Sequence, residues 1–207
     1  RYTTTVSELF DQPVGEGATY RLKFGLSASY DNRDSGLMAT RGHRLALGLD
    51  WAPQVDGWLD GRAGFSVDAR QYVRLPLGFR LRAQLAARGL LGAHHHPSDR
   101  LYAGGMGTLR GFYAFAVAPQ VLGKPGAMLG GDKLAHTTIE LGRTVGSVFE
   151  PFVFVDGANA FHQDEGWLQP ANRDREDTGG LIWSAGWGGL LRLPVLPLRF
   201  EWGYPLV

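Results

Sequence analysis

Alternation between apolar and polar residues, repeated in seven segments, constrains the fold of this chain most strongly. The clearest case runs from Tyr20 to Tyr30, where every second residue is apolar and the residues between are polar or glycine. Because successive side chains of a β-strand point to opposite faces, this pattern predicts a strand with one apolar face and one polar face. The pattern recurs in segments 44–51, 63–70, 79–88, 135–142, 181–192 and 198–206, and an eighth predicted strand near 149–160 is apolar on both faces until Asp156. The sequence therefore predicts an all-β fold of eight strands.

The composition of the two strand faces separates two kinds of all-β fold. A soluble sandwich also alternates apolar and polar residues along each strand. Here, however, the polar faces are rich in arginine and glycine, and the apolar faces end in aromatic residues (Tyr20, Tyr30, Trp51, Phe79, Trp183, Trp202 and Tyr204). Lipid-facing strands of about 9–11 residues, bounded by aromatic girdles and backed by a polar interior, are typical of transmembrane barrels. We therefore favour an antiparallel transmembrane β-barrel.

The links between the predicted strands alternate in length. The links at 74–78, 144–148 and 193–197 are short, whereas those at 52–61, 93–131 and 161–179 are long and polar or glycine-rich. Outer-membrane barrels have short periplasmic turns and longer extracellular loops, so this alternation favours the same fold. The link at 31–43 is an exception, because it lies on the short-turn side but is long.

Overall composition excludes several classes of function. The chain of 207 residues has no cysteine, which excludes disulfides and thiolate chemistry. Its net charge is +1, with 21 basic and 20 acidic residues, so no global charge favours binding of nucleic acid. The sequence also contains no apolar run near the roughly 18 residues that a membrane helix needs.

Five groups of residues stand out by their order and spacing, namely Asp31–Asp34 with Thr40–Leu45, Leu109–Phe112, Gly130–Lys133 with Ile139–Leu141, Phe154–Asn159 and Pro197–Leu206. Together they resemble the C-terminal barrel half of the BamA/TamA superfamily of outer-membrane assembly factors, also called the bacterial surface antigen family. Leu109-Arg110-Gly111-Phe112 is similar to the V/I-R-G-F/Y signature of the family's sixth extracellular loop, and Phe154–Asn159 resembles its F-x-D-x-G strand. Further similarity lies in Asp31–Asp34 with Thr40–Leu45, in Gly130–Lys133 with Ile139–Leu141, and in Pro197–Leu206. Two positions depart from the pattern: Leu109 replaces a β-branched residue, and Ala158 replaces a glycine that would permit close backbone approach.

The resemblance implies an architecture and a location. It implies a sixteen-strand barrel in the bacterial outer membrane, of which residues 1–207 would supply strands eight to fifteen. The loop at about 93–131 would fold into the lumen. The first strands, the last strand and the periplasmic POTRA repeats are expected outside this chain, because an open sheet edge cannot face lipid.

Arg110 has two candidate partners that the strand parities identify without the resemblance. Glu140 lies on the polar face of its strand, and Asp156 interrupts an apolar segment, where a buried carboxylate needs a partner. The planar guanidinium of arginine binds carboxylates in a bidentate manner and stays charged. We therefore expect Arg110 to pair with Asp156 first and Glu140 second, holding the loop inside the lumen, with Phe154 and Gly157 as supporting motif residues. The alternative is a solvated loop arginine facing ordinary lumen carboxylates.

Other motifs carry weaker functional signals. His94–His96 point alternately at a strand end, so we expect no metal site there, because zinc needs three or four convergent ligands. Gly104–Gly107 lacks the Gly-Lys-Ser/Thr ending of a phosphate loop, and we interpret it as backbone that lets the loop turn inward. Ser98 and Asp99 beside His96 show no nucleophile elbow, so no catalytic residues are expected.

The resemblance implies a non-enzymatic factor that assembles, inserts or translocates outer-membrane proteins, without a cofactor. Its implied partners are outer-membrane lipids, unfolded outer-membrane or secreted client proteins and accessory assembly proteins, but no nucleic acid. Three alternatives stay open: a two-partner secretion transporter, the barrel domain of a patatin-like phospholipase, and a passive diffusion porin, which would not need the Arg-Gly-Phe signature.

Overall fold

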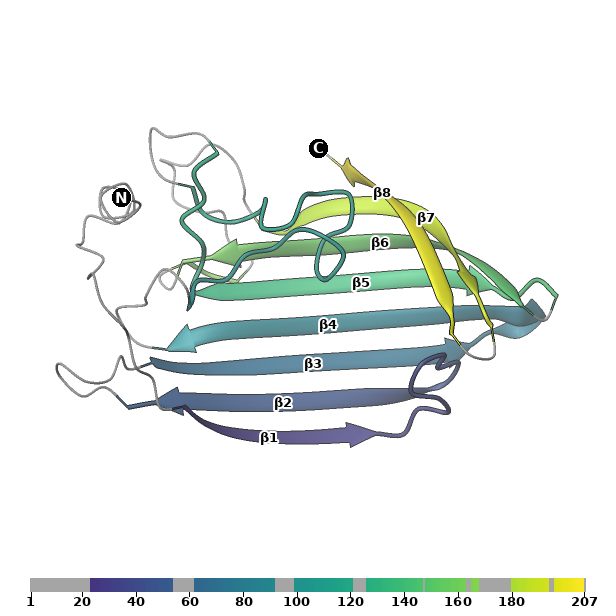
Figure 1. Cartoon of the computed structure of the whole chain (residues 1–207), viewed down its shortest axis with the longest axis horizontal. Coiled ribbons are helices and arrows are strands. Elements are labelled where there is room, and N and C mark those ends of the chain that lie inside the picture. The colour runs from purple at the N-terminus through teal and green to yellow at the C-terminus, as the bar shows by residue number, and fades with distance from the viewer. Residues whose placement is uncertain are drawn as a thin grey trace.

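One eight-stranded antiparallel sheet forms the described part of the molecule (Figure 1). The computed structural model describes residues 23–53, 62–91, 99–120, 126–146, 148–162, 165–167, 180–193 and 196–206. The strands follow one another in sequence order and are β1 (Phe24–Asp31), β2 (Gly42–Ala52), β3 (Arg62–Arg74), β4 (Phe79–Leu91), β5 (Lys133–Arg143), β6 (Phe149–Phe161), β7 (Ile182–Leu191) and β8 (Leu198–Leu206). The prediction of eight antiparallel strands is confirmed, and a single sheet in this order is not a two-sheet sandwich.

The registers place apolar residues opposite apolar residues on one face of the sheet. Leu26 lies opposite Leu49, and Leu47 opposite Val67. The aromatic rings of Trp187 and Trp202 stack across β7 and β8, with ring centroids 6.3 Å apart. The predicted parities are therefore confirmed. The first strand begins at Phe24, while the more N-terminal part of its predicted segment, including Tyr20, lies outside the described residues.

The apolar face of the sheet is open to its surroundings. Residues from every strand contribute to it with substantial exposure, and they include Phe24, Leu26, Leu49, Trp51, Leu85, Ile139, Val153, Trp187, Trp202 and Tyr204. A contiguous apolar surface of this extent is unfavourable in water and marks a surface that meets an apolar partner or lipid. No helix within the described residues is long and apolar enough to cross a membrane.

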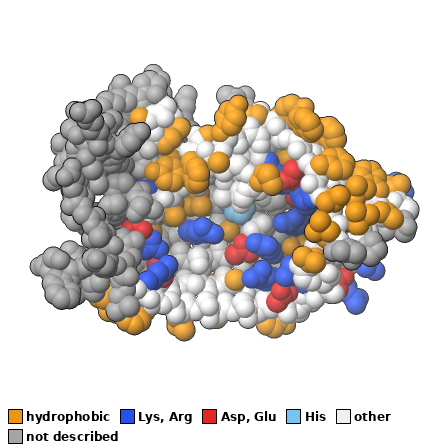
Figure 2. Space-filling model, in the orientation of Figure 1, with side chains coloured by type: hydrophobic (Ala, Val, Ile, Leu, Met, Phe, Trp, Pro, Cys, Tyr) orange, Lys and Arg blue, Asp and Glu red, His pale blue; other side chains and the backbone are white. Residues whose placement is uncertain are grey.

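The opposite face of the sheet is polar and lies on its hollow side. Charged side chains of both signs gather there (Figure 2). Many of them are paired: the Arg70–Asp68 ion pair measures 2.7 Å, and the Arg80–Glu150 pair, which joins β4 to β6, also measures 2.7 Å. Several of the arginines on the polar parity, among them Arg70, Arg80 and Arg82, thus have carboxylate partners on the same face.

The link between β1 and β2 is ordered by side-chain hydrogen bonds. The backbone N–H of His43 donates to Oδ1 of Asn32 at 2.6 Å. Oδ1 of Asp34 accepts the backbone N–H of Thr40 at 2.7 Å, and its Oδ2 accepts the Thr40 hydroxyl. The guanidinium of Arg33 lies over the ring of Tyr72 in β3, 5.8 Å from its centroid. The link that is unusually long for its side of the sheet therefore folds into a defined structure.

Acid is expected to loosen this link. The hydrogen bonds from the Thr40 hydroxyl and backbone to the Asp34 carboxylate lower the pKa of Asp34 from 3.8 to about 2. Since the folded-state pKa is depressed, the stabilisation is complete above the unfolded pKa and is lost as the pH falls from about 4 to about 2. An NMR titration of the Asp34 carboxyl carbon should show a midpoint near the lower value. Thr40→Ala should move that midpoint back towards 3.8, and an unchanged midpoint would contradict the assignment.

Candidate functional site

The loop between β4 and β5 lies over the hollow face of the sheet, beside β5 to β8 (Figure 1). Its described residues, 99–120 and 126–132, are joined by isolated bridges between Leu101 and Gly131 and between Ala103 and Val117. The backbone N–H of Leu90 donates to the carbonyl of Asp132 at 2.7 Å, so the loop re-enters the sheet directly at the end of β4. These backbone hydrogen bonds give the long loop a defined conformation and join it to the end of β4.

An apolar cluster fastens the loop to the sheet beneath it. Leu109 and Ala158 are both fully buried, and they pack together with Ala103, Val117, Leu134 and Ala160. Phe112 packs against the edge of this cluster. The alanine at position 158, where the resembling family has glycine, thus contributes its methyl group to the contact under the loop.

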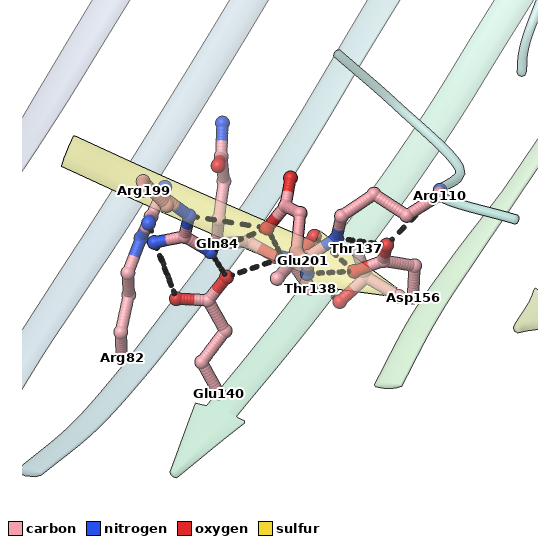
Figure 3. A network of polar contacts seen from close by, with 9 residues as sticks. All are labelled: Arg82, Gln84, Arg110, Thr137, Thr138, Glu140, Asp156, Arg199 and Glu201. Atoms are coloured by element: carbon pink, nitrogen blue, oxygen red, sulfur yellow. Dashed lines mark hydrogen bonds and ion pairs between the residues drawn. The ribbon is translucent and has the colours of Figure 1, made fainter. Parts of the chain in front are cut away.

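Arg110 points from this loop onto the sheet and meets carboxylates there (Figure 3). Its Nε donates to Oδ2 of Asp156 at 2.6 Å and its Nη2 to Oδ1 at 2.6 Å, which makes a bidentate pair. Its Nη1 donates to Oε1 of Glu140 at 2.7 Å, and its backbone N–H donates to Oδ2 of Asp156 at 3.2 Å. The exposed fractions of Arg110, Asp156 and Glu140 are 7%, 1% and 6%, so the three charges meet away from solvent.

A third carboxylate, which the sequence reasoning missed, completes the shell around Arg110. Oε2 of Glu201 in β8 accepts a hydrogen bond from Nη1 of Arg110 at 2.9 Å. Arg199, also in β8, donates to both Glu140 and Glu201, and Arg82 of β4 donates to Glu140 at 3.2 Å. The network thus contains three arginines and three carboxylates, and it connects the loop to β4, β5, β6 and β8.

Two further contacts fix the geometry of the bidentate pair. The guanidinium carbon of Arg110 lies 3.4 Å from the ring centroid of Phe154, which is a close cation–π contact. The hydroxyl of Thr138 donates to Oδ1 of Asp156 at 2.9 Å. Phe154 therefore has a direct contact with Arg110, whereas Gly157 lies on the apolar face, where a Cβ atom would meet the Trp183 ring at 2.7 Å. Gly157 makes room for Trp183 on the outer surface of the sheet.

The Gly111 backbone lies directly on β8. Gly111 has a φ of +89°, and a Cβ atom there would lie 2.8 Å from the carbonyl carbon of Gly203. The contact is reciprocal, since a Cβ atom on Gly203 would lie 2.7 Å from the nitrogen of Gly111. Neither glycine leaves space for a side chain, and Gly203 is a second site residue that strand parity alone did not identify.

The glycine-rich stretch before Leu109 forms a tight turn. Gly104 and Gly105 have φ values of +113° and +80°, a conformation that side chains disfavour. The Thr108 hydroxyl accepts a hydrogen bond from the backbone N–H of Gly104 at 2.9 Å. This turn reverses the chain and directs Arg110 at the sheet, in keeping with the interpretation of Gly104–Gly107 as backbone for an inward turn.

The chemistry of this site is that of a neutralised ion-pair network. It holds a loop to a wall through charge-assisted hydrogen bonds, which are the strong class of hydrogen bond. Among the described residues, no three His, Cys, Asp or Glu side chains converge as a metal site would require. His94–His96 and Ser98 lie outside the described residues, so the expectations about them stay predictions.

Comparison with known proteins identifies similar chains. Residues 3–207 match the family described as the Omp85 superfamily domain. A solved structure, "The crystal structure of BamA from Haemophilus ducreyi lacking POTRA domains 1-3", has a similar fold, with a TM-score of 0.74 and 16% sequence identity. The similarity covers 100% of this chain but only 44% of that chain. No curated protein matches the sequence.

Proposed function

This chain belongs to the Omp85 superfamily, and from that premise we propose that it is the barrel part of a factor that assembles, inserts or translocates proteins at the bacterial outer membrane. Family membership confirms the resemblance that the loop and strand motifs indicated. The finer assignment to an assembly factor of the BamA or TamA type is supported by the Leu109–Phe112 signature and its carboxylate partners.

The observation that carries the proposal is the loop fastened across the hollow face by Arg110. A passive porin needs an open passage, and its selectivity comes from the residues that line it. Here the loop backbone rests on β8 and its arginine is bound by three carboxylates. A loop held in this way serves a regulated or structural purpose inside the barrel rather than simple diffusion.

The proposed architecture is a sixteen-strand transmembrane barrel of which β1 to β8 form strands eight to fifteen. The apolar, aromatic-rich face of the sheet would meet lipid, and the charged face would line the lumen. Further strands would pair the outer edges of β1 and β8, because lipid cannot satisfy exposed backbone groups. In this proposal the remaining strands and any POTRA repeats belong to other parts of a longer polypeptide.

The proposed mechanism is non-enzymatic and uses no cofactor. Unfolded outer-membrane or secreted clients would engage the barrel through strand pairing at its lateral seam, away from β1 to β8, since unpaired backbone groups there template further strands. The loop network would keep the wall at β5, β6 and β8 rigid while the client is handled. Outer-membrane lipids and accessory assembly proteins would be the other partners, and nucleic acid would not.

Reconstitution of the full-length protein into liposomes tests this function. Unfolded outer-membrane barrel protein added outside should reach its folded, membrane-inserted form faster than in empty liposomes, and Asp156→Ala should reduce that gain. A client that accumulates in the liposome lumen instead would favour the secretion transporter, and hydrolysis of the liposome phospholipids would favour the phospholipase. No acceleration by a correctly folded protein would contradict the assembly function.

A further inference from the structure

A second polar feature lies on the hollow face, between the β1–β2 link and the short-link end of the sheet. It is a cavity of about 190 Å³ whose walls come from residues 36–40 of the link and from β3 to β8. Since water occupies about 30 Å³ per molecule in the liquid, the cavity has room for a small oxyanion together with several waters. Six of its lining side chains are arginines, namely Arg33, Arg70, Arg80, Arg82, Arg192 and Arg199.

At one place in this cavity arginines outnumber carboxylates, because Arg80 and Arg192 share one carboxylate. Both guanidinium groups donate to the same atom, Oε2 of Glu150, with the Arg80 contact at 2.7 Å. The other four arginines have carboxylate partners: Arg33 pairs with Asp31, Arg70 with Asp68, Arg82 with Glu140, and Arg199 with Glu140 and Glu201. Around Glu150, two fixed positive charges therefore face one negative charge.

The side chains that carry this excess charge are held in place and have donors to spare. The side chains of Arg80 and Arg192 are each 16% exposed, and that of Glu150 is 12% exposed. A guanidinium has five N–H donors, yet within the described residues Arg192 uses only its Nη2 in a hydrogen bond, and Arg82 only its Nη1. Among the described residues, the Nε atoms of Arg82 and Arg192 are buried without an acceptor. Buried donors of this kind require an acceptor that the protein part described here does not supply.

A glycine in β5 makes room for the Glu150 side chain beside the cavity. Gly142 lies between Arg80 of β4 and Phe152 of β6 in the sheet registers. A Cβ atom on Gly142 would lie 2.9 Å from Oε1 of Glu150, so the glycine lets the carboxylate cross β5 to reach Arg80. Arg80 and Arg82 are two residues apart on β4 and therefore share the inner face, about 7 Å from each other along the strand.

We propose that this cavity is a binding site for a phosphate-type oxyanion, held between Arg80 and Arg82 of β4 and Arg192 at the end of β7. A tetrahedral oxyanion offers acceptors in several directions, which suits guanidinium groups that approach from two separate strands. Its negative charge offsets the excess positive charge around Glu150. The site stands on the cavity and its charges alone, independently of the proposed role in protein assembly.

The phosphate group has two possible sources, a free phosphate compound or a lipid headgroup. The cavity opens on the polar face, opposite the apolar face of the sheet, and a bilayer lipid would have to reach it through the interior. Inorganic phosphate and a short-chain phosphatidic acid, each added to the full-length protein in uncharged detergent, therefore distinguish the two. Binding of inorganic phosphate assigns a free anion, and binding of phosphatidic acid alone assigns a headgroup.

Calorimetric titration at pH 8, where phosphate is a dianion, tests the site with three variants. Arg192→Gln should weaken binding about tenfold, as expected for the loss of one charge-assisted contact. Glu150→Gln should strengthen binding several-fold, because it removes the competing carboxylate; a variant that merely misfolds would not gain affinity. Arg88→Gln is the matched control. Arg88 lies on the same face of β4 as Arg82, roughly 20 Å from it along the strand, and borders a different cavity.

The outcomes distinguish specific binding of the anion in this cavity from non-specific electrostatic attraction to the arginine-rich face of the sheet. Weaker binding by Arg192→Gln, tighter binding by Glu150→Gln and no change with Arg88→Gln would support the proposal. Equal weakening by Arg192→Gln and Arg88→Gln would overturn it, as would the absence of binding for both ligands at millimolar concentration.

Discussion

Replacing Arg110 with alanine is expected to destabilise the folded protein by about 3–5 kcal/mol, the cost of breaking a buried ion pair from one side. The substitution leaves Asp156, which is 1% exposed, without its bidentate partner, while Glu140 keeps Arg82 and Arg199. It also removes the contact with the Phe154 ring. Urea unfolding in detergent, followed by tryptophan fluorescence, measures the loss.

A double-mutant cycle separates the ion pair from other effects of the substitution. Asp156→Ala should cost a similar amount, and the double variant should cost clearly less than the sum of the two single variants. Arg110→Lys should recover only part of the stability, because an ammonium group cannot reproduce the bidentate geometry. Arg44→Ala, on the inner face of β2, is the control and should have a small effect. Additive costs for Arg110→Ala and Asp156→Ala would show that the two side chains do not interact.

Gly203→Ala is expected to lift the loop from β8 and destabilise the protein by about 1–3 kcal/mol, the usual cost of forcing an extra methyl group into a packed contact. The new Cβ atom would lie 2.7 Å from the nitrogen of Gly111 and 2.8 Å from the carbonyl carbon of Arg110. Both are backbone atoms, so the strain cannot be relieved by a change of rotamer. The same unfolding assay, together with proteolysis of the loop, measures the effect.

A glycine in the same loop provides the matched control for this prediction. A Cβ atom on Gly107 would have no heavy atom within 4 Å, and Gly107→Ala should therefore leave stability and proteolysis unchanged. Gly111→Ala should be worse than Gly203→Ala, because it adds an unfavourable positive φ to the same clash. If Gly203→Ala behaves like Gly107→Ala, the loop does not rest on β8.

In the strands that alternate, strand parity was sufficient to predict which face each residue occupies. From Phe24 onwards, alternation assigns the exposed apolar side chains to one face and Glu140 and Glu201 to the other, whereas Asp156 was recognised because it interrupts an otherwise apolar segment. The physical reason is that a strand has a fixed two-residue period, so a local pattern determines orientation. The lengths of the short links were equally informative: a link of only a few residues can join two strands only if they are adjacent and antiparallel.

Strand register and sheet curvature could not be predicted in the same way. Glu201 reaches Arg110 because β8 curls back over the hollow side, near a loop that lies 91 positions earlier in the chain. No local pattern in the sequence determines that approach. Local sequence does not reveal the role of Gly203 either, because that role depends on the contact between its backbone and the backbone of Gly111. Register, twist and loop path are long-range properties, which explains why two of the three carboxylates around Arg110 were predicted and the third was not.

Disulfide trapping between positions 110 and 156 tests the central claim most directly, namely that the loop is held on the inner wall by Arg110. A disulfide requires Cα atoms within about 7 Å, and the Arg110 backbone nitrogen lies 3.2 Å from Oδ2 of Asp156. In the folded full-length protein in membranes, Arg110→Cys/Asp156→Cys should crosslink rapidly on mild oxidation, whereas Arg110→Cys/Asp50→Cys, with its second position on β2, should not. A folded, membrane-assembled protein in which the first pair stays reduced would contradict the inserted loop.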